Sequence, residues 1–371
     1  MFDFIPLDQY SHYFHIAVFV FVMFTFILCQ RGIILNKDIV NINAGLGFIV
    51  AVLIIFYIGL RPINGVFGDT ANYINGFNEL SIIPLKWSWG GDFLFYNMMA
   101  WFAHHSSINV FFTVCALLYV GLLWLAMKNI FNTYYFVPFL VLICMFTFWE
   151  YGVNGIRNGI ASSFFILAMT YVNNPLISLL LCVVSIGFHK SMVLIVVAAI
   201  LAWFVQNPFL YLIIWLTSIP FSYLMGNRLQ TLLAGFSLVR DSDDRISKYL
   251  AYTHEQMLSD GLIVEMSFRW DFLLYSALGV VVGYYFIFKR NFKDEYYHWI
   301  YNTYLLTNVF WILVIRAAYS NRFAQISWFI MPIVLVYPFM KRRFWINHEK
   351  MLGYALLAFY AFAFYYNIVK G

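Results

Sequence analysis

Residues 42–60 read INAGLGFIVAVLIIFYIGL, a run of 19 residues without a charged side chain. A helix that crosses a bilayer needs about 20 consecutive, mostly apolar residues, so this run is long enough to span a membrane. Residues 12–30, HYFHIAVFVFVMFTFILCQ, form a second run of the same kind. Two such runs near the start of the chain predict helices that cross a membrane.

The composition of the whole chain supports this reading. Of 371 residues, 63% are hydrophobic and only 11% are charged. Soluble domains carry about 25% charged residues, so this chain lacks the polar side chains to coat a water-facing globule. The same numbers exclude a disordered chain, which needs low hydrophobicity and high charge. The four cysteines lie inside apolar runs, where they behave as small hydrophobic residues and do not form a disulfide scaffold.

Apolar runs recur along the sequence and predict an all-α polytopic membrane protein with about 12 transmembrane helices, in a range of roughly 11–14. We expect one membrane domain over residues 1–371, with two longer outer loops at about 61–107 and 226–269. The segment 93–102 is apolar but too short to span. The expected spans lie near residues 12–30, 42–60, 108–127, 134–149, 157–173, 176–188, 191–206, 208–225, 270–288, 299–315, 323–339 and 351–368.

The distribution of basic residues predicts the orientation. Loops on the cytoplasmic side of a membrane protein are enriched in Lys and Arg. If both termini lie outside, the inner loops collect a large basic excess and the two long loops lie outside. The inner basic residues are then Arg31, Lys37, Lys128, Lys289, Arg290, Lys293, Lys341, Arg342, Arg343 and Lys350.

Charged residues at the ends of spans cost free energy unless they are solvated or used, so each is a candidate site. Arg157 lies among three glycines and two asparagines in the segment 151–161. Such a segment permits close backbone approach and offers N–H groups to an anionic ligand. The alternative is an interfacial arginine whose charged end reaches the membrane surface.

His189 and Lys190 occupy a short turn between two expected spans. Histidine exchanges protons readily near neutral pH, so His189 is a candidate base, although a structural role in the turn is the alternative. No second histidine or cysteine stands at metal-ligand spacing, so we expect no metal site. No cofactor is expected either.

Two further arginines, Arg316 and Arg322, flank one short outer turn that contains no acid. Guanidinium groups match phosphate oxygens bidentately, which favours phosphate binding over simple anchoring at the interface. Arg269 stands two residues before Asp271, with which it can pair. Arg245 lies in the second outer loop, and both arginines are candidates for substrate binding.

Asp69 is the candidate carboxylate of the first outer loop. It lies in a glycine-containing segment, and Tyr73 follows one helical turn later. This is a suitable place for a carboxylate that positions a sugar hydroxyl, although a solvated loop acid is the alternative. Together, outer arginines, one histidine and few carboxylates predict a site for a lipid-linked phosphate or pyrophosphate.

The chain resembles the EpsG/Wzy-type family of bacterial membrane proteins that polymerise O-antigen, capsule or exopolysaccharide repeat units. Four segments carry the resemblance, in the order in which the family has them. They are Asp69-x-x-x-Tyr73-x-x-x-Phe77, the segment 154–161 (NGIRNGIA), Phe188-His189-Lys190-Ser191 and Asn321-Arg322-Phe323. One departure is Asn158, where the family often has glutamine.

The resemblance implies an inner-membrane glycosyltransferase of GT-C-type architecture. A glycan on undecaprenyl pyrophosphate would be the donor and an incoming lipid-linked repeat unit the acceptor, on the outer face of the bacterial cytoplasmic membrane. Arg157, Arg316 and Arg322 would stabilise charge on the leaving pyrophosphate. His189, Asp69 or an acid of the second loop would accept the proton of the attacking hydroxyl, and the residues do not decide between them.

Other functions remain open. A glycan ligase, or another outer-face transferase for glycosyl or acyl groups, would use the same kind of site with a different acceptor. A transporter of lipid-linked glycan predicts charges through the middle of the membrane, whereas here they gather at one face. The expected partners are lipid-linked oligosaccharides, membrane lipid, a chain-length regulator and a flippase, and no nucleic acid.

Overall fold

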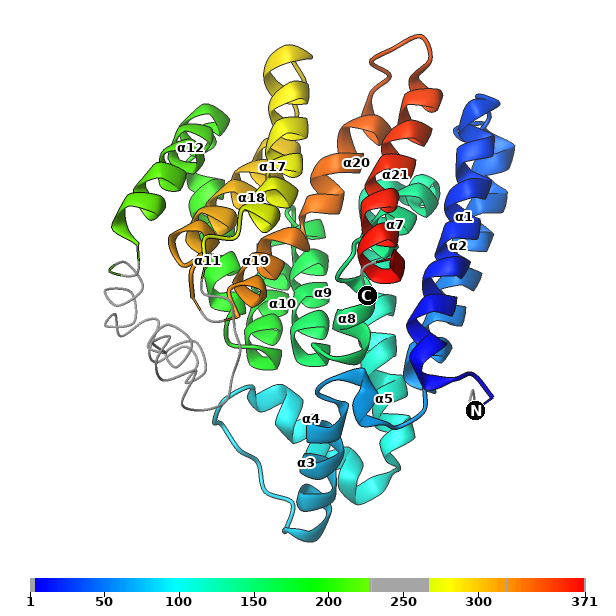
Figure 1. The fold of residues 1–371 in the computed structure, drawn as a ribbon, viewed down its shortest axis with the longest axis vertical. Coiled ribbons are helices and arrows are strands. Elements are labelled where there is room, and N and C mark those ends of the chain that lie inside the picture. Colours follow the sequence, from blue (N-terminus) through cyan, green and yellow to red (C-terminus); the bar gives the residue numbers. More distant parts are fainter. Residues whose placement is uncertain (1–3, 227, 229–266, 318, 370–371) are drawn as a thin grey trace. The chain divides into compact units, whose positions relative to one another are not determined.

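A computed structural model describes residues 4–226, 228, 267–317 and 319–369 of the chain (Figure 1). The described part consists of helices joined by turns and loops and has no strand. Its α-helices are α1 (Tyr10–Gln30), α2 (Lys37–Gly59), α3 (Thr70–Ile82), α4 (Phe93–His105), α5 (Ile108–Ala116), α6 (Leu122–Phe131), α7 (Phe136–Ile143), α8 (Phe148–Val153), α9 (Ile156–Thr170), α10 (Pro175–Phe188), α11 (Met192–Phe204), α12 (Pro208–Met225), α17 (Trp270–Tyr284), α18 (Glu295–Leu313), α19 (Asn321–Trp328), α20 (Met331–Lys341) and α21 (His348–Phe364).

Short 3₁₀ and π segments extend or join these helices. They are η1 (Leu7–Gln9), η2 (Gly65–Phe67), η3 (Leu117–Gly121), η4 (Asn132–Tyr135), η5 (Tyr285–Lys289) and η6 (Tyr365–Val369). Asn132 has a positive φ of 52° where α6 ends, and η4 then leads into α7. Asparagine tolerates this left-handed backbone better than most residues, which suits it to the position.

Six helical stretches of the described chain are long and apolar enough to cross a membrane. This confirms the predicted all-α polytopic class. Two apolar helices, α10 and α11, are shorter, so the number of about 12 spans stays a prediction. The six stretches are Leu7–Gln30, Lys37–Gly59, Ile108–Ile143, Pro208–Met225, Trp270–Lys289 and Asn321–Lys341.

Some predicted spans differ from the helices observed. The segment predicted to span over 134–149 is interrupted, because α7 ends at Ile143 and α8 begins at Phe148. The apolar segment 93–102 belongs to α4, a helix of 13 residues that is too short to cross a bilayer, as expected.

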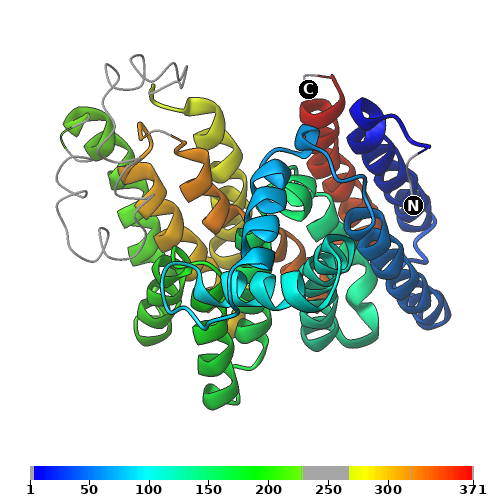
Figure 2. The same cartoon turned by 90° about the horizontal axis from the view of Figure 1, so that it is seen from below.

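The chain divides into two compact units, residues 1–189 with 339–371 and residues 190–338, which we describe separately. In the first unit, α1 and α21 lie side by side and antiparallel (Figures 1 and 2). Near the start of α1, the carbonyl of His15 accepts a hydrogen bond from the Tyr360 hydroxyl, and midway along α1 Phe19 packs on Phe364 with ring centroids 5.4 Å apart. Near the end of α1, Phe26 packs on Tyr354, which lies in the first half of α21, at 5.6 Å. The start of α1 and the end of α21 therefore lie at the same end of the first unit.

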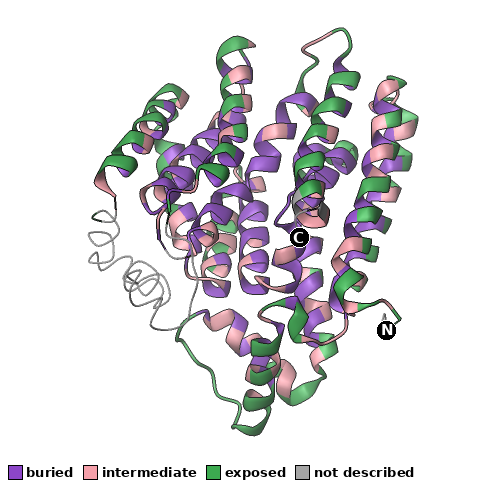
Figure 3. Cartoon of the chain, viewed as in Figure 1, coloured by how far each residue is buried: buried purple, intermediate pink, exposed green. Residues whose placement is uncertain are grey.

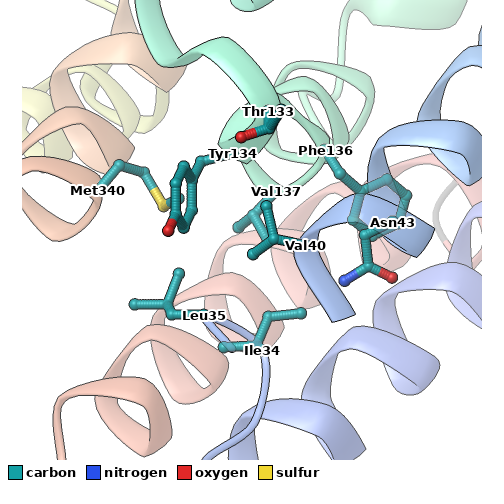
Figure 4. A pocket seen from close by; sticks show the side chains of 9 residues that line it. All are labelled: Ile34, Leu35, Val40, Asn43, Thr133, Tyr134, Phe136, Val137 and Met340. Carbon is teal, nitrogen blue, oxygen red and sulfur yellow. The ribbon is translucent and has the colours of Figure 1, made fainter. Parts of the chain in front are cut away.

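Several segments with basic residues lie at the opposite end of the first unit. Lys341 donates a hydrogen bond to the carbonyl of Ile130 at 3.0 Å. A cavity of only about 10 Å³ lies here, between the turn after α1, the start of α2, η4 and Met340 (Figure 4). Basic residues of these neighbouring segments include Arg31, Lys37, Lys128, Lys341, Arg342, Arg343 and Lys350. All of them belong to the set that we predict to face the cytoplasm.

The outward faces of α1 and α2 are apolar and exposed (Figure 3). Val20 and Ile27 of α1 are 59% and 50% exposed, and Leu53 of α2 is 58% exposed. In water a continuous apolar face of this kind would be an aggregation hazard, whereas it fits contact with lipid chains. The burial pattern therefore agrees with a membrane protein.

The second unit packs around α18. This helix has polar residues along its length, and most of its side chains are buried, including Asn302, Thr303, Thr307 and Asn308. The indole N–H of Trp215 on α12 donates to Asn308 at 2.7 Å, and the Asn308 amide donates to Ser327 of α19 at 3.0 Å. Protein neighbours thus satisfy Asn308, as the interior of a membrane bundle requires.

Candidate functional site

Asn154 ties the segment 61–107, which we predict to face outward and call the first outer loop, to the turn between α8 and α9. Its side-chain oxygen accepts a hydrogen bond from the backbone N–H of Asp69 at 2.8 Å, and its carbonyl accepts one from the Tyr73 hydroxyl at 3.2 Å. Its amide N–H donates to Glu150 at 3.4 Å. The loop and the turn carry two of the predicted motifs, so Asn154 holds these motifs together.

Gly68 makes this contact possible. Its φ is +65°, and a Cβ placed on it would lie 2.5 Å from the side-chain oxygen of Asn154. Only glycine adopts this backbone readily and leaves the space that the asparagine occupies. The glycine before Asp69 therefore has a specific role: it lets the loop approach the α8–α9 turn.

Arg157, in the first turn of α9, forms a buried ion pair with Asp92. One nitrogen of its guanidinium group, Nη1, lies 2.6 Å from Asp92 Oδ2, and the two side chains are only 11% and 6% exposed. The same nitrogen donates to the Tyr96 hydroxyl at 3.1 Å. Asp92 immediately precedes α4 and Tyr96 lies in its first turn, so this short helix supplies both partners.

His189 contacts the same aspartate as Arg157. It ends α10 in an extended conformation, and its Nδ1 lies 3.2 Å from the same Asp92 oxygen that pairs with Arg157. Gly187 lets α10 approach α4 closely, because a Cβ there would lie 2.6 Å from Leu94. No hydrogen bond joins Nε2 of His189 to the described part of the chain. The second ring nitrogen is therefore free to meet a substrate.

Tyr73 links the cluster to Asn154. The tyrosine is buried and its hydroxyl oxygen accepts a hydrogen bond from Arg157. Burial raises the pKa of Tyr73 above its usual range, although the Arg157 charge opposes this effect. Tyr73 therefore stays protonated at neutral pH and donates to Asn154. We refer to Asp92, Arg157, His189, Tyr73 and Tyr96 as the Asp92 cluster.

Asp69 is near the cluster but outside it. Its carboxylate accepts a hydrogen bond from the Asn72 amide at 3.1 Å, and its backbone N–H is bound by Asn154. The side chain is half-buried and makes no hydrogen bond or ion pair with Arg157 or His189 within the described chain. Asp69 is therefore placed to orient the loop, and its predicted role as a base remains a prediction.

Arg61, just beyond the end of α2, is a buried arginine that the sequence did not single out. It is 2% exposed and donates to the carbonyl of Ile58 and to the Thr70 hydroxyl, at 2.8 and 3.2 Å. Its guanidinium also lies 4.5 Å from the ring centroid of Phe112. Burial lowers the pKa of Arg61 to about 10, so it remains charged at neutral pH and anchors the start of the first outer loop.

The remaining predicted residues belong to the second unit or lie outside the described residues. Arg316 is half-buried, with its guanidinium 5.6 Å from the ring centroid of Tyr223. Arg322, in the first turn of α19, lies 5.1 Å from the ring of Tyr319. Lys190 is the first residue of the second unit. Arg245 falls outside the described residues.

Arg269 and Asp271 pair with each other, as expected. Two nitrogens of the guanidinium group meet the two carboxylate oxygens at 2.9 and 2.7 Å. A bidentate pair of this kind largely neutralises the charge of Arg269. Its predicted part in substrate binding stays a prediction.

The sequence predicted three residues that the structure brings together: Tyr73, Arg157 and His189. It missed Asp92 and Tyr96. Asp92 follows two glycines in the first outer loop and directly precedes a helix, which is the same kind of signal that singled out Asp69. The sequence did not predict an acidic partner for Arg157, because loop packing brings in this carboxylate from 65 residues away.

Among the described residues, no group of three or more His, Cys, Asp or Glu side chains is placed to hold a metal ion. A chelation experiment below tests whether the reaction requires one.

Comparison with models of known protein families identifies the family of this chain. A model of the EpsG family matches residues 45–371, most of the chain, so the chain belongs to the EpsG family. No curated protein and no solved structure is found to match it. Membership of this family supports a glycosyltransferase-like function in polysaccharide synthesis.

Proposed function

We propose that this member of the EpsG family is a polysaccharide polymerase that joins lipid-linked oligosaccharide repeat units on the outer face of the bacterial cytoplasmic membrane. The observation that carries the proposal is the Asp92 cluster, in which one carboxylate oxygen binds both Arg157 and His189. This arrangement places a proton acceptor and a fixed positive charge side by side. Both favour the transfer of a sugar from a pyrophosphate to a hydroxyl, because the base takes the hydroxyl proton and the positive charge stabilises the leaving pyrophosphate.

His189 is the proposed base. Asp92 binds Nδ1, which favours the tautomer with its proton there and leaves Nε2 as the acceptor. A carboxylate on the far side of an imidazole also stabilises the positive charge that forms when the ring takes up a proton. Asp92 therefore positions and supports His189 and needs no contact with substrate.

Arg157 supplies the charge for the leaving group. A guanidinium group has five N–H donors, and the contacts to Asp92 and Tyr96 use a single nitrogen. The other nitrogens retain donors for phosphate oxygens, apart from the contact with Tyr73. Asp92 and Tyr96 hold the group in place, so little reorganisation is needed when negative charge develops on the pyrophosphate.

We propose a single displacement at the anomeric carbon of the donor sugar. The acceptor hydroxyl gives its proton to Nε2 of His189 while its oxygen bonds to the anomeric carbon of the donor sugar. The bond from this carbon to the pyrophosphate oxygen breaks, and the lipid pyrophosphate leaves with the bonding electrons next to Arg157. His189 then returns its proton to bulk water. Arg316, Arg322 and Lys190 are proposed as further phosphate-binding residues of the second unit.

The experiment uses cells in which this chain is the sole polymerase for a surface polysaccharide. In cells with His189→Ala, surface glycan should shorten to single repeat units, because transfer to an incoming unit requires the base. His104→Ala is the matched control: His104 is an exposed histidine at the end of α4, and its contacts are with the carbonyl of Ile83 and the ring of His105, outside the Asp92 cluster. Long glycan in both variants would refute the assignment of His189. Loss of every surface glycan, single units included, would indicate a ligase.

A further inference from the structure

The first unit contains a second cavity that the Asp92 cluster does not use. Its volume is about 360 Å³, and residues from η1 and the start of α1, from η2, and from α8 with the turn after it line its walls. Cavities that bind small molecules have volumes of about 300–1,000 Å³. The cavity of Figure 4, at about 10 Å³, holds no more than a water molecule.

The lining carries two carboxylates, an amide and an indole. Asp8 and Glu150 supply the carboxylates, Asn154 the amide and Trp149 the indole. Trp149 is only 8% exposed, and its indole N–H makes no hydrogen bond to the described part of the chain. A nearly buried donor that lines a cavity and lacks a protein partner is suited to a ligand, because an unsatisfied N–H costs free energy when it is desolvated.

These groups select a class of ligand. Two carboxylates repel phosphate, so the cavity is unsuited to the pyrophosphate end of the substrate. They are strong acceptors for hydroxyl hydrogens, and the indole N–H donates to a hydroxyl or ring oxygen. We infer that this cavity, lined by Asp8, Trp149, Glu150 and Asn154, binds a neutral sugar ring rich in hydroxyl groups.

The cavity is connected to the Asp92 cluster by direct contacts. Glu150 accepts a hydrogen bond from Asn154, whose carbonyl accepts one from Tyr73, and Tyr73 in turn contacts Arg157. A sugar held by Glu150 is thus fixed relative to Arg157 through two residues. Resting on the proposed function, this assigns the cavity to a sugar of the repeat unit, next to the site where the new bond forms.

The test measures binding of methyl glycosides of glucose, galactose and N-acetylglucosamine to the purified full chain, by saturation-transfer NMR. The wild-type chain should bind at least one of them at millimolar concentration. Glu150→Gln and Trp149→Phe should each weaken binding by about tenfold, the loss expected for one hydrogen bond to a charged or desolvated group. Asp8 is exposed, so Asp8→Asn tests the same cavity without disturbing packing.

Glu295→Gln and Trp203→Phe are matched controls, since both residues are exposed and belong to the second unit. Arg157→Lys should keep glycoside binding while it loses polymer formation. Absence of binding in the wild-type chain, or equal binding in all three cavity variants, overturns the sugar site. Binding that depends on the cavity residues in a chain that makes no polymer leaves the sugar site standing and refutes the polymerase instead.

Discussion

The oxygen Oδ2 of Asp92 gives Arg157 and His189 their chemical character. A buried guanidinium group without a carboxylate would carry a large desolvation cost, and the 2.6 Å contact offsets it. The same oxygen binds Nδ1 of His189 and sets which ring nitrogen faces the substrate. One residue thus both holds the charge and orients the base.

Asp92→Asn should therefore damage both functions at once. An asparagine of the same shape leaves Arg157 buried without a counter-charge, and breaking such a pair costs about 3–5 kcal/mol of stability. We also expect the polymerisation rate to fall by about 100-fold or more, the typical contribution of a positioned base. Rates and thermal unfolding of the purified variant check this prediction. Asp38→Asn, at an exposed acid in the first turn of α2, should change neither value.

Metal removal provides a second test at this scale. The proposed step uses side chains alone, with His189 for the proton and Arg157 and other basic residues for the charge, so a chelator such as EDTA should leave the rate of the purified chain unchanged. A loss of activity that added Mg²⁺ or Mn²⁺ restores would show that a metal ion, and not Arg157 alone, neutralises the leaving pyrophosphate.

Single residues could be predicted from the sequence where they violate the apolar pattern. Arg157 and His189 do so because they interrupt apolar runs, and Tyr73 follows an acid by one helical turn. The role of Asp92 could not be predicted in this way. Acidic residues are common in loops, and the local sequence does not show that Asp92 packs against the start of α9 and the end of α10. Trp149 and Glu150 lie in the first turn of the short helix α8, and they line a cavity only because the start of the chain packs near η2.

Among the elements, the turn between α8 and α9 organises the site. Asn154 and Gly155 separate α8 from α9, so Arg157 lies in the first turn of α9. Asn154 lies outside both helices, and its side chain binds the backbone of the first outer loop at Asp69. The sequence predicted the importance of this segment but assigned it to the start of one span. The separate helix α8 depends on tertiary contacts that periodicity does not show.

Gly68→Ala should separate the outer loop from this turn. An alanine costs about 1–2 kcal/mol at a positive φ, and here its Cβ would also collide with Asn154. Because small displacements of catalytic groups are costly, we expect activity to fall by about 100-fold. Gly32→Ala is the matched control, with φ of +68° and no atom within 4 Å of the added Cβ. Equal activity of the two variants would contradict the role of the Gly68 contact.

Element α18 shows why hydropathy alone misjudges some spans. It covers most of the predicted span 299–315, yet it is rich in Tyr, Thr and Asn and is not apolar enough to stand among the spanning stretches. Its buried surroundings explain this composition: a helix enclosed by protein can carry polar side chains where a lipid-facing helix cannot.

Within the first unit, the Asp92 cluster and the group of basic residues around Lys341 lie at opposite ends. The start of α1, the end of α21 and the Asp92 cluster share one end, and basic residues such as Lys341 gather at the other. The division agrees with the predicted orientation, in which both termini and the first outer loop face away from the cytoplasm. The structure fixes which segments share an end, and the membrane side remains a prediction.

Cysteine labelling tests this orientation. Asn78→Cys on α3 should react with a membrane-impermeant maleimide in intact cells, whereas Asn347→Cys, before α21, should react only after the membrane is opened. Both asparagines are exposed, and the wild-type chain is the background control because its cysteines are buried or half-buried. The reverse pattern would place the Asp92 cluster in the cytoplasm and contradict an outer-face reaction.

The most direct test of the central claim is polymerisation by the purified chain in liposomes that contain one synthetic polyprenyl-pyrophosphate repeat unit. Gel separation of the products measures the length of the lipid-linked glycan. The wild-type chain should produce a ladder, and Arg157→Lys and His189→Ala should return only the starting unit, while Arg31→Lys at an exposed turn should retain the ladder. Failure of the wild-type chain to extend the unit, or ladders of equal length from all variants, would contradict the account.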